Sequence, residues 1–525
     1  MMLKFSVSDL WIPSALVMVA VPIYKLTKSS QKDTQELISK AQSKREQVRV
    51  SIEMTANWEV PSEEAQSLVL NSDMSTVHSL VIQKKVTGRE VFLTSMKKLR
   101  EEGLDWVSDI DLSIVPLNTG DLAGALVGVQ DSVSVKGMTS SFGAGVFAYN
   151  VQHKDAPLIK VMRESGAVLL LKTPSSQCDR SFEFTNNISG KIPNSEFPDR
   201  VGSEGELLRK GCLNLIVSTD VLGTLRYSAL ASKVLSFKPS SKRISSDLGS
   251  GSQDLPLLKK NIGVLAKSVN DIRKWAEVVI NQPLFEADPK IVPLAWNNEV
   301  YSSQTPMTVG YFESEEFWEV SESMKRAVKQ AVQKLQSKGH KVVPIQMPSL
   351  EQVSKVILSL IAFDSQPESR LGKEQYLGYF TQLTNALKTN KLVRYFKKKY
   401  TQWKSGTKEL LPYEVASRSQ CYEYLLNMIE GINFKQSFYE LWNTNELDAL
   451  IAPFPFPVLK QGASRDSYLG FGYLSVFNLL DCCVGSALCE DVTEEFENIG
   501  LGTAVQVVTL PYQEEQCLKL MAQLS

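Results

Sequence analysis

The chain has 525 residues, of which 43% are hydrophobic, so it is long enough to bury a large core. Its 57 basic and 58 acidic residues nearly cancel, leaving a formal net charge of −1. This balance gives no general attraction to nucleic acid, so we expect no nucleic-acid partner.

A mostly apolar stretch covers residues 5–24, with Asp9 as its one charged side chain and Lys4 and Lys25 on either side. A helix of this length is about 30 Å long, which matches the hydrocarbon core of a bilayer. Two prolines weaken the helix, although membrane spans tolerate proline better than soluble helices do. Because no small-residue cleavage site follows, we favour a retained single-pass anchor over residues 1–28 against a cleaved signal peptide. Two membranes stay open as its location: the mitochondrial inner membrane and the endoplasmic reticulum.

Residues 29–115 are expected to form a helical region that packs on the core. Residues 29–53 are polar but place apolar side chains at helical spacing, which predicts an exposed amphipathic helix. A helix start is expected at residues 61–64, and two more helices are expected over residues 72–83 and 90–102.

Short apolar runs farther along predict buried strands, at Ala125–Val129, Val168–Leu171 and Leu447–Ile451. They alternate with helical segments, a pattern typical of an α/β fold with a mixed, twisted sheet covered by helices. A Ser- and Gly-rich run over residues 239–253 is predicted to be a surface loop inserted in this core.

Aromatic and basic side chains are interleaved over residues 375–404. Two interpretations stay open for this segment. Basic residues beside aromatic ones suit a surface that lies on anionic lipid headgroups. The other interpretation is a helical hairpin that packs on the core and keeps a solvated basic face.

Neither metal nor cofactor chemistry is indicated. His78, His153 and His340 lie far apart, without the spacing of a metal site, and no phosphate-binding loop is present. The seven cysteines include no Cys-x-x-Cys pair, so we expect reduced and mostly buried thiols. Cys212 is a conceivable replacement nucleophile, but it has no partner histidine.

Three longer runs carry a resemblance to a known family: Leu122–Asp131 (LAGALVGVQD), Ser218–Tyr227 (STDVLGTLRY) and Ala504–Glu515 (AVQVVTLPYQEE). The chain resembles the amidase-signature hydrolases, most of all the branch of membrane-bound fatty acid amide hydrolases, from about Leu117 to about Met521. The resemblance implies a single large domain over residues 116–525.

In that family a lysine takes a proton from a bridging serine, which in turn activates a serine nucleophile. The resemblance places Gln130 at the lysine position, Arg200 at the bridging serine and Thr224 at the nucleophile. If the alignment to the family were shifted by three residues here, Ser203 would take the bridging position instead of Arg200. The family's oxyanion hole is a Gly-Gly turn before the nucleophile, and here that turn is Val221–Leu222–Gly223.

These substitutions predict a degenerate triad. Glutamine has no titratable group near neutral pH, so Gln130 cannot act as a general base. Arg200 has no acceptor, and Thr224 needs an adjacent base that the sequence does not identify. We also expect Leu222 to oppose a left-handed backbone in the turn and to add bulk there.

The sequence thus predicts a membrane-anchored pseudoenzyme that needs no cofactor. It would serve as a structural or docking subunit with protein partners in a larger membrane assembly, or as a module that binds membrane lipid. The rival hypothesis is an active amidase or esterase that hydrolyses fatty acid amides through Thr224.

Overall fold

The computed structural model describes residues 35–525, apart from residues 180, 250–256, 316, 364–370, 372–373, 375–376, 378–420, 464–466, 468–469 and 490–501. The predicted anchor over residues 1–28 and most of the 375–404 segment therefore lie outside the described residues. Among the helices that are described, none combines the length and the apolar character of a membrane span.

One mixed sheet forms the centre of the described chain, with eleven strands in the order β1-β3-β2-β6-β8-β7-β12-β13-β11-β9-β10. Strand β2 is parallel to β3 and β6, and β9 is parallel to β10 and β11, whereas the other neighbours are antiparallel. The strands are β1 (Asp109–Ile110), β2 (Leu126–Gln130), β3 (Val168–Thr173), β6 (Leu215–Asp220), β7 (Leu235–Lys238), β8 (Asn261–Ala266), β9 (Thr308–Tyr311), β10 (Lys341–Pro344), β11 (Ala449–Pro453), β12 (Cys483–Cys489) and β13 (Thr503–Thr509).

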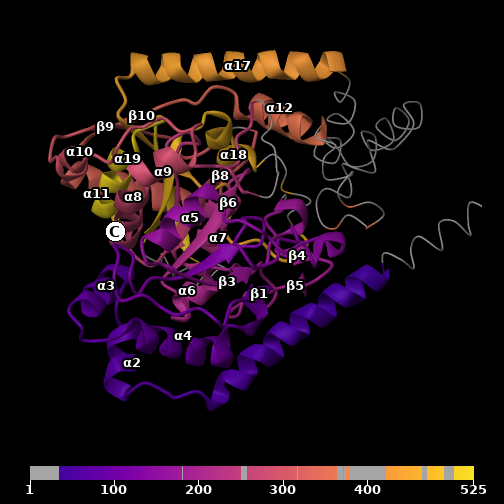
Figure 1. Ribbon diagram of the computed structural model, residues 1–525. Coiled ribbons are helices and arrows are strands. Elements are labelled where there is room, and N and C mark those ends of the chain that lie inside the picture. Colours follow the sequence, from indigo (N-terminus) through magenta and orange to yellow (C-terminus); the bar gives the residue numbers. More distant parts are fainter. Residues whose placement is uncertain are drawn as a thin grey trace, which may run out of the picture.

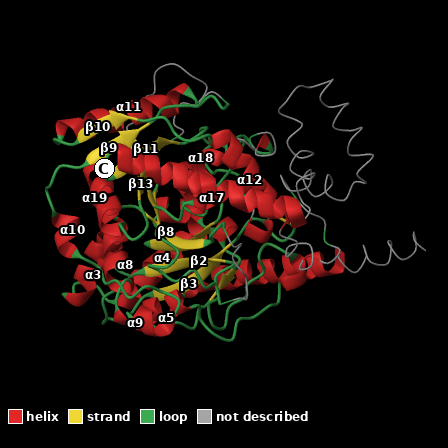
Figure 2. Ribbon diagram, turned by 90° about the horizontal axis from the view of Figure 1, so that it is seen from above, coloured by secondary structure: helices red, strands yellow, loops and turns green. Residues whose placement is uncertain are grey.

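Helices surround this sheet, as Figure 2 shows. They are α2 (Glu63–Leu70), α3 (Met74–Ile82), α4 (Gly88–Glu102), α5 (Pro157–Glu164), α6 (Glu206–Arg209), α7 (Thr224–Ser232), α8 (Val269–Val279), α9 (Gln282–Ala287), α10 (Asn298–Ser302), α11 (Glu322–Ser337), α12 (Leu350–Phe363), α17 (Cys421–Thr444), α18 (Gly472–Leu479) and α19 (Glu514–Leu524). A two-stranded hairpin of β4 (Thr185–Asn186) and β5 (Gly190–Lys191) stands apart from the sheet. The three predicted strands correspond to β2, β3 and β11, and the predicted mixed sheet covered by helices is confirmed.

Alternation along each strand divides the core between the two faces of the sheet. In β3, Leu169 packs in one apolar cluster with α5, α8, α11 and α19, while the next residue, Leu170, packs in another with α2, α3 and α4. A further cluster on α7, α12, α17 and α18 includes Leu450 of β11 and Val508 of β13. Because both faces are covered, the strands are apolar on both sides, which explains their nearly continuous apolar runs.

The N-terminal helices begin at capping residues that can be recognised in the local sequence. Ser62 and Asp73 accept hydrogen bonds from backbone N–H groups in the first turns of α2 and α3. Thr87 and Glu90 form a reciprocal capping box at the start of α4. An amphipathic helix over residues 35–54 precedes them and, in Figure 1, runs diagonally from the right-hand side down to the bottom of the molecule. The helices predicted in this region are thus present, within a few residues of the predicted ends.

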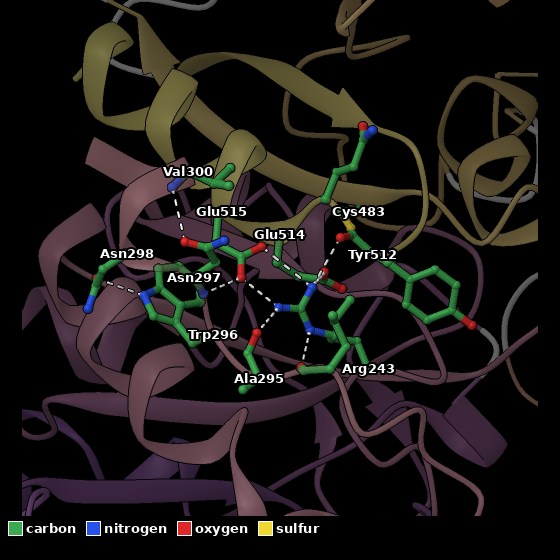
Figure 3. Close-up of polar contacts among 12 residues, drawn as sticks. Arg243, Ala295, Trp296, Asn297, Asn298, Val300, Cys483, Tyr512, Glu514 and Glu515 are labelled. Carbon is green, nitrogen blue, oxygen red and sulfur yellow. Dashed lines mark hydrogen bonds and ion pairs between the residues drawn. The ribbon is translucent and has the colours of Figure 1, made fainter. Parts of the chain in front are cut away.

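Residues 239–249, the described part of the 239–253 run, do not form the surface loop that the composition predicts. Arg243, Ile244 and Leu248 are buried. The Arg243 guanidinium contacts the carboxylates of Glu514 and Glu515 in α19, with N–O distances of 2.9 and 2.5 Å, and Figure 3 shows it enclosed by these contacts. Serine and glycine usually mark exposed turns, but here a buried arginine fastens the run to the C-terminal helix.

Candidate functional site

Gln130 is the last residue of β2, and its side chain lies against the neighbouring strand β6. The carboxamide oxygen accepts hydrogen bonds from the backbone N–H of Thr219 at 3.0 Å and from the Thr219 hydroxyl at 2.6 Å. The Ser132 hydroxyl lies 3.3 Å from the same oxygen. Gln130 is 5% exposed, so this position is a buried hydrogen-bond acceptor within the sheet.

Thr224 is the first residue of α7 and is partly exposed. Its hydroxyl donates to the backbone carbonyl of Thr219 at 3.1 Å. The side chains of Gln130 and Thr224 are therefore both hydrogen-bonded to Thr219. Within the part of the chain that is described, no acidic or basic side chain is hydrogen-bonded to the Thr224 hydroxyl.

Arg200 lies in an irregular segment that pairs with Lys460 through one antiparallel bridge. Its guanidinium donates to the backbone carbonyl of Val458 at 2.8 Å and lies 3.7 Å from the Asp199 carboxylate. Ser203, the alternative residue for the bridging position, is fully buried and donates to the carbonyl of Ser228 at 2.8 Å. The Ser203 hydroxyl is thus hydrogen-bonded to α7, one helical turn beyond Thr224.

The turn before α7 places its left-handed residue at Gly223, with φ of 91°. A β-carbon at Gly223 would lie 2.4 Å from the β-carbon of Leu474 in α18, so only glycine fits this position. Leu222 has no positive φ, and the left-handed conformation of this turn belongs to its neighbour Gly223. The expected bulk of Leu222 is present, since its side chain is buried in the apolar cluster of α18.

A buried ion pair stabilises the same turn. Asp220 and Arg226 are both 0% exposed and lie 3.0 Å apart. Burial disfavours the charged form of Asp220, but the Arg226 guanidinium and its hydrogen bonds outweigh burial, so the pKa of Asp220 lies below its ordinary value. Arg226 also donates to Asn478 at 2.6 Å and to Gln506 at 2.7 Å. These two partners come from α18 and β13, so the network joins three distant parts of the chain at the turn.

A second buried carboxyl group, that of Glu204, lies between β3 and β6. The hydroxyls of Thr173 and Ser218 both donate to it, and the Ser218 bond is 2.6 Å long. Burial raises the pKa of Glu204 to about 7, and the two hydrogen bonds only partly oppose the rise. Glu204 lies between Ser203 and Gly205 in the sequence, and no local pattern there indicates that its carboxyl group is buried.

The other sequence candidates lie elsewhere. Cys212 is fully buried, and burial raises the pKa of its thiol to about 12, so it is unsuited to act as a nucleophile. The six cysteines whose side chains are described are free thiols, four of them buried, as predicted. His340 is buried and is hydrogen-bonded to the backbone of Met307 and to Gln523, a structural role.

Comparison with known proteins gives a consistent result. A family model described as Amidase matches residues 94–518. The chain is 24% identical over 439 residues to Fatty-acid amide hydrolase 1 of Sus scrofa, covering 77% of this chain and 75% of that protein. It is 22% identical over 492 residues to Fatty acid amide hydrolase 1 of Caenorhabditis elegans, covering 85% and 83%. A solved structure titled "Fatty acid amide hydrolase" superposes with a TM-score of 0.71 and 16% identity, over 96% of this chain and 94% of that one.

The family model covers most of the chain, and it includes the strand of Gln130, the turn before Thr224 and the start of the C-terminal helix, where Arg243 contacts Glu514 and Glu515. The superposed structure shares the fold over almost the whole length. The chain therefore belongs to the amidase-signature family and is a distant relative of fatty acid amide hydrolase.

Proposed function

We propose that this protein is a catalytically inactive member of the amidase family, anchored in a membrane by its N-terminal segment and used as a structural or docking subunit of a larger membrane assembly. The proposal has two parts. Loss of the relay rests on the geometry around Thr219, whereas the membrane and the partners rest on the apolar N-terminal sequence and on the need for another use once catalysis is lost.

The observation that carries the first part is the state of Gln130. Its carboxamide oxygen is bound by two donors from Thr219, and a carboxamide stays uncharged across the physiological pH range. It can hold β6 in place, but it has no lone pair of sufficient basicity to take a proton from a hydroxyl. The first step of a lysine-initiated relay therefore has no counterpart at this position.

The remaining two positions support the same conclusion. The Arg200 guanidinium is directed to the carbonyl of Val458 and has only donors, so it cannot relay a proton. The Thr224 hydroxyl donates its proton to the carbonyl of Thr219, which is too weak a base to remove it. Since the members of a catalytic unit act together, one defect is enough to stop the relay.

Labelling with a fluorophosphonate probe tests whether Thr224 is nucleophilic. The wild-type chain and a Thr224→Ala variant would be labelled side by side, with a heat-denatured sample as the control for non-specific reaction and an active amidase as the positive control. We expect the wild type and the variant to label equally weakly. Specific labelling of the wild type that disappears in Thr224→Ala would support the rival amidase or esterase function and overturn the proposal.

A further inference from the structure

Helix α17 crosses the top of the molecule in Figure 1 and turns one lysine toward the core. Gly431, Lys435 and Tyr439 lie four residues apart, so they share one face of the helix. A β-carbon at Gly431 would lie 2.4 Å from the Leu257 side chain, so this face packs against the residues that precede β8. Lys435 and Tyr439 are half-buried there. The Lys435 ammonium group is therefore held at the boundary between α17 and the core.

A second lysine lies beside the first. Lys259 is half-buried and lies between Leu257, which packs against α17, and Asn261, the first residue of β8. Burial lowers the pKa of Lys435, the carboxylate of Asp481 opposes this fall, and the positive charge of Lys259 adds to it. The two lysines are thus close enough to each other and to Asp481 for their charges to interact.

Asp481 and Asn261 are joined by a hydrogen bond next to these lysines. The Asp481 carboxylate accepts from the backbone N–H of Ser241 at 2.9 Å, from the Ser241 hydroxyl at 2.7 Å and from the Asn261 amide at 3.4 Å. The Asn261 amide nitrogen also donates to the carbonyl of Pro239 at 3.0 Å. Because both partners of this nitrogen are acceptors, the hydrogen bonds fix the orientation of the amide.

The carboxamide oxygen of Asn261 has no hydrogen-bond partner among the described residues. Asn261 is 0% exposed. Buried polar atoms nearly always have a partner, so an orphaned one needs an explanation. This oxygen requires a donor that the surrounding side chains do not supply.

A third lysine brings more positive charge to the same place. Lys238 is 0% exposed, and its ammonium group donates at 3.1 Å to the Pro239 carbonyl, which also accepts from Asn261. None of the ion pairs among the described residues includes Lys238, Lys259 or Lys435.

The carboxylates nearby do not balance these three lysines. Asp220 forms its own ion pair with Arg226. Asp481 supplies one negative charge, and Arg243 with its two glutamates supplies one more. Three positive charges against two negative ones leave a positive charge in excess. An excess that is partly buried favours an anion as its partner.

The ligand must offer both acceptors and a donor. Lysine ammonium groups only donate, so they need negatively charged oxygens, whereas the Asn261 oxygen only accepts and needs a hydroxyl hydrogen. Hydrogen phosphate has both, because it is negatively charged and one of its oxygens keeps a proton at neutral pH. Sulfate, a carboxylate and a deprotonated phosphomonoester have the acceptors but lack that proton. Water has the proton but lacks the charge.

We propose that Lys259 and Lys435 bind a hydrogen phosphate ion, whose hydroxyl group donates to the side chain of Asn261. Lys238 adds positive charge from the core side. The site lies where β7 ends and β8 begins, beside the end of β6, so it is on the same edge of the sheet as the turn before Thr224. It does not depend on whether Thr224 is nucleophilic. A bound ion would join α17 to the sheet.

Isothermal titration calorimetry of the full-length protein in mild detergent measures the binding of inorganic phosphate at neutral pH and constant ionic strength. We expect Lys435→Gln to weaken phosphate binding by about tenfold or more, because it removes a charge-assisted contact. Lys355→Gln is the matched control. It removes the same charge from α12, where Lys355 pairs with Glu351 at 2.7 Å, and should leave phosphate binding unchanged. Absence of phosphate binding to the wild type, or an equal loss in both variants, would overturn the proposal.

Lys259→Gln gives a second test from a different segment of the chain. It should weaken phosphate binding to a similar extent as Lys435→Gln, and it keeps the proposal testable if that variant does not fold. The circular dichroism spectrum shows which variants retain the wild-type fold. Unchanged phosphate affinity in a folded Lys259→Gln variant would contradict the site.

A comparison of ligands tests the hydroxyl hydrogen without any substitution. Sulfate should bind the wild type at least about tenfold more weakly than phosphate, since it offers no donor to Asn261. Equal affinities would mean that the lysines attract any anion and would contradict the role of Asn261. Phosphatidic acid with short acyl chains distinguishes a lipid headgroup from free phosphate. Tighter binding of this lipid than of inorganic phosphate would assign the site to a lipid and overturn the proposal.

Discussion

Glu204 shows how a single side chain near the candidate site contributes to stability. It is fully buried between β3 and β6, where two hydroxyls donate to it, yet its pKa is raised because burial opposes the charged form. It binds a proton more tightly in the folded state than in the unfolded state. Within this fold it is therefore a pH-dependent structural group.

The sign of the effect follows from the two pKa values. Burial raises the pKa of Glu204 from its ordinary value of 4.5 to about 7 in the folded state. Between these values the folded protein holds more protons, so the free energy of unfolding should fall as pH rises from about 4.5 to 7 and level off above that. We expect Glu204→Gln to remove this loss, which is on the order of 3 kcal/mol.

Chemical denaturation at pH 5 and at pH 8 measures the effect. The wild type should lose more stability between these values than the Glu204→Gln variant does. Lys172 is not expected to confuse the result. Burial lowers the pKa of Lys172 to about 8 from 10.5, so its contribution changes only between those two values, with stability rising as pH rises. Identical pH profiles for the wild type and the variant would contradict the role of Glu204.

At the scale of elements, the C-terminal helix α19 depends on one arginine. Arg243 is 1% exposed at its side chain and contacts Glu514 and Glu515, and it also donates to the carbonyls of Leu294 and Ala295. Figure 3 shows Glu514, Glu515 and Ala295 converging on the guanidinium. Two buried carboxylates without this cation would remain desolvated and unpaired, so the arrangement joins the 239–249 run, the stretch before α10 and α19.

Replacing this arginine should be severely destabilising. We expect Arg243→Met to lower the free energy of unfolding by about 3–5 kcal/mol, because it strands Glu514 and Glu515 in the core. Arg273→Met is the matched control, since Arg273 pairs with Glu277 across one helical turn and both side chains are 27% exposed. That change should cost at most about 0.5 kcal/mol. Urea titration in mild detergent compares the two variants. Similar losses in the free energy of unfolding would contradict the role of Arg243 as the buried partner of Glu514 and Glu515.

The contrast between these elements explains what the sequence could predict. Local signals were sufficient for α2, α3 and α4, whose caps lie within three residues of the groups they bind. Apolar runs were sufficient for β2, β3 and β11, because strands covered on both faces contain few polar residues. The prediction of a surface loop over residues 239–253 was wrong because the partners of Arg243 lie more than 250 residues away in the sequence. No local pattern indicates such a contact.

At the site, the motifs singled out Gln130 and Thr224, and in the structure both side chains are hydrogen-bonded to Thr219. Their places in a degenerate triad stay a prediction. The sequence did not show which residue of the turn is left-handed, and in the structure it is Gly223. The burial of Glu204 was also hidden, since it depends on how β3 and β6 are placed beside each other.

At the scale of the whole molecule, the proposed anchor and the folded part are separable in the sequence. The apolar clusters of the core are formed by residues from Val48 onward. The apolar stretch over residues 5–24 precedes the helix of residues 35–54, which is joined to the core by Lys44 through Asp109 and Thr139. Membrane attachment is therefore proposed to reside in residues 1–28, and stability in the rest of the chain.

Deleting residues 1–28 tests this division. We expect the shortened protein to leave the membrane on alkaline carbonate extraction, since removal of a span of about 30 Å eliminates the hydrophobic attachment. Its unfolding temperature should match that of the full chain in the same detergent, because the core clusters remain complete. A control deletion of residues 518–525 should do the reverse, keeping the protein in the membrane but destabilising it, because Leu518 and Met521 are buried in the core. If the protein without residues 1–28 stayed in the carbonate-washed pellet, attachment would lie in the folded part, and the proposed division would be wrong.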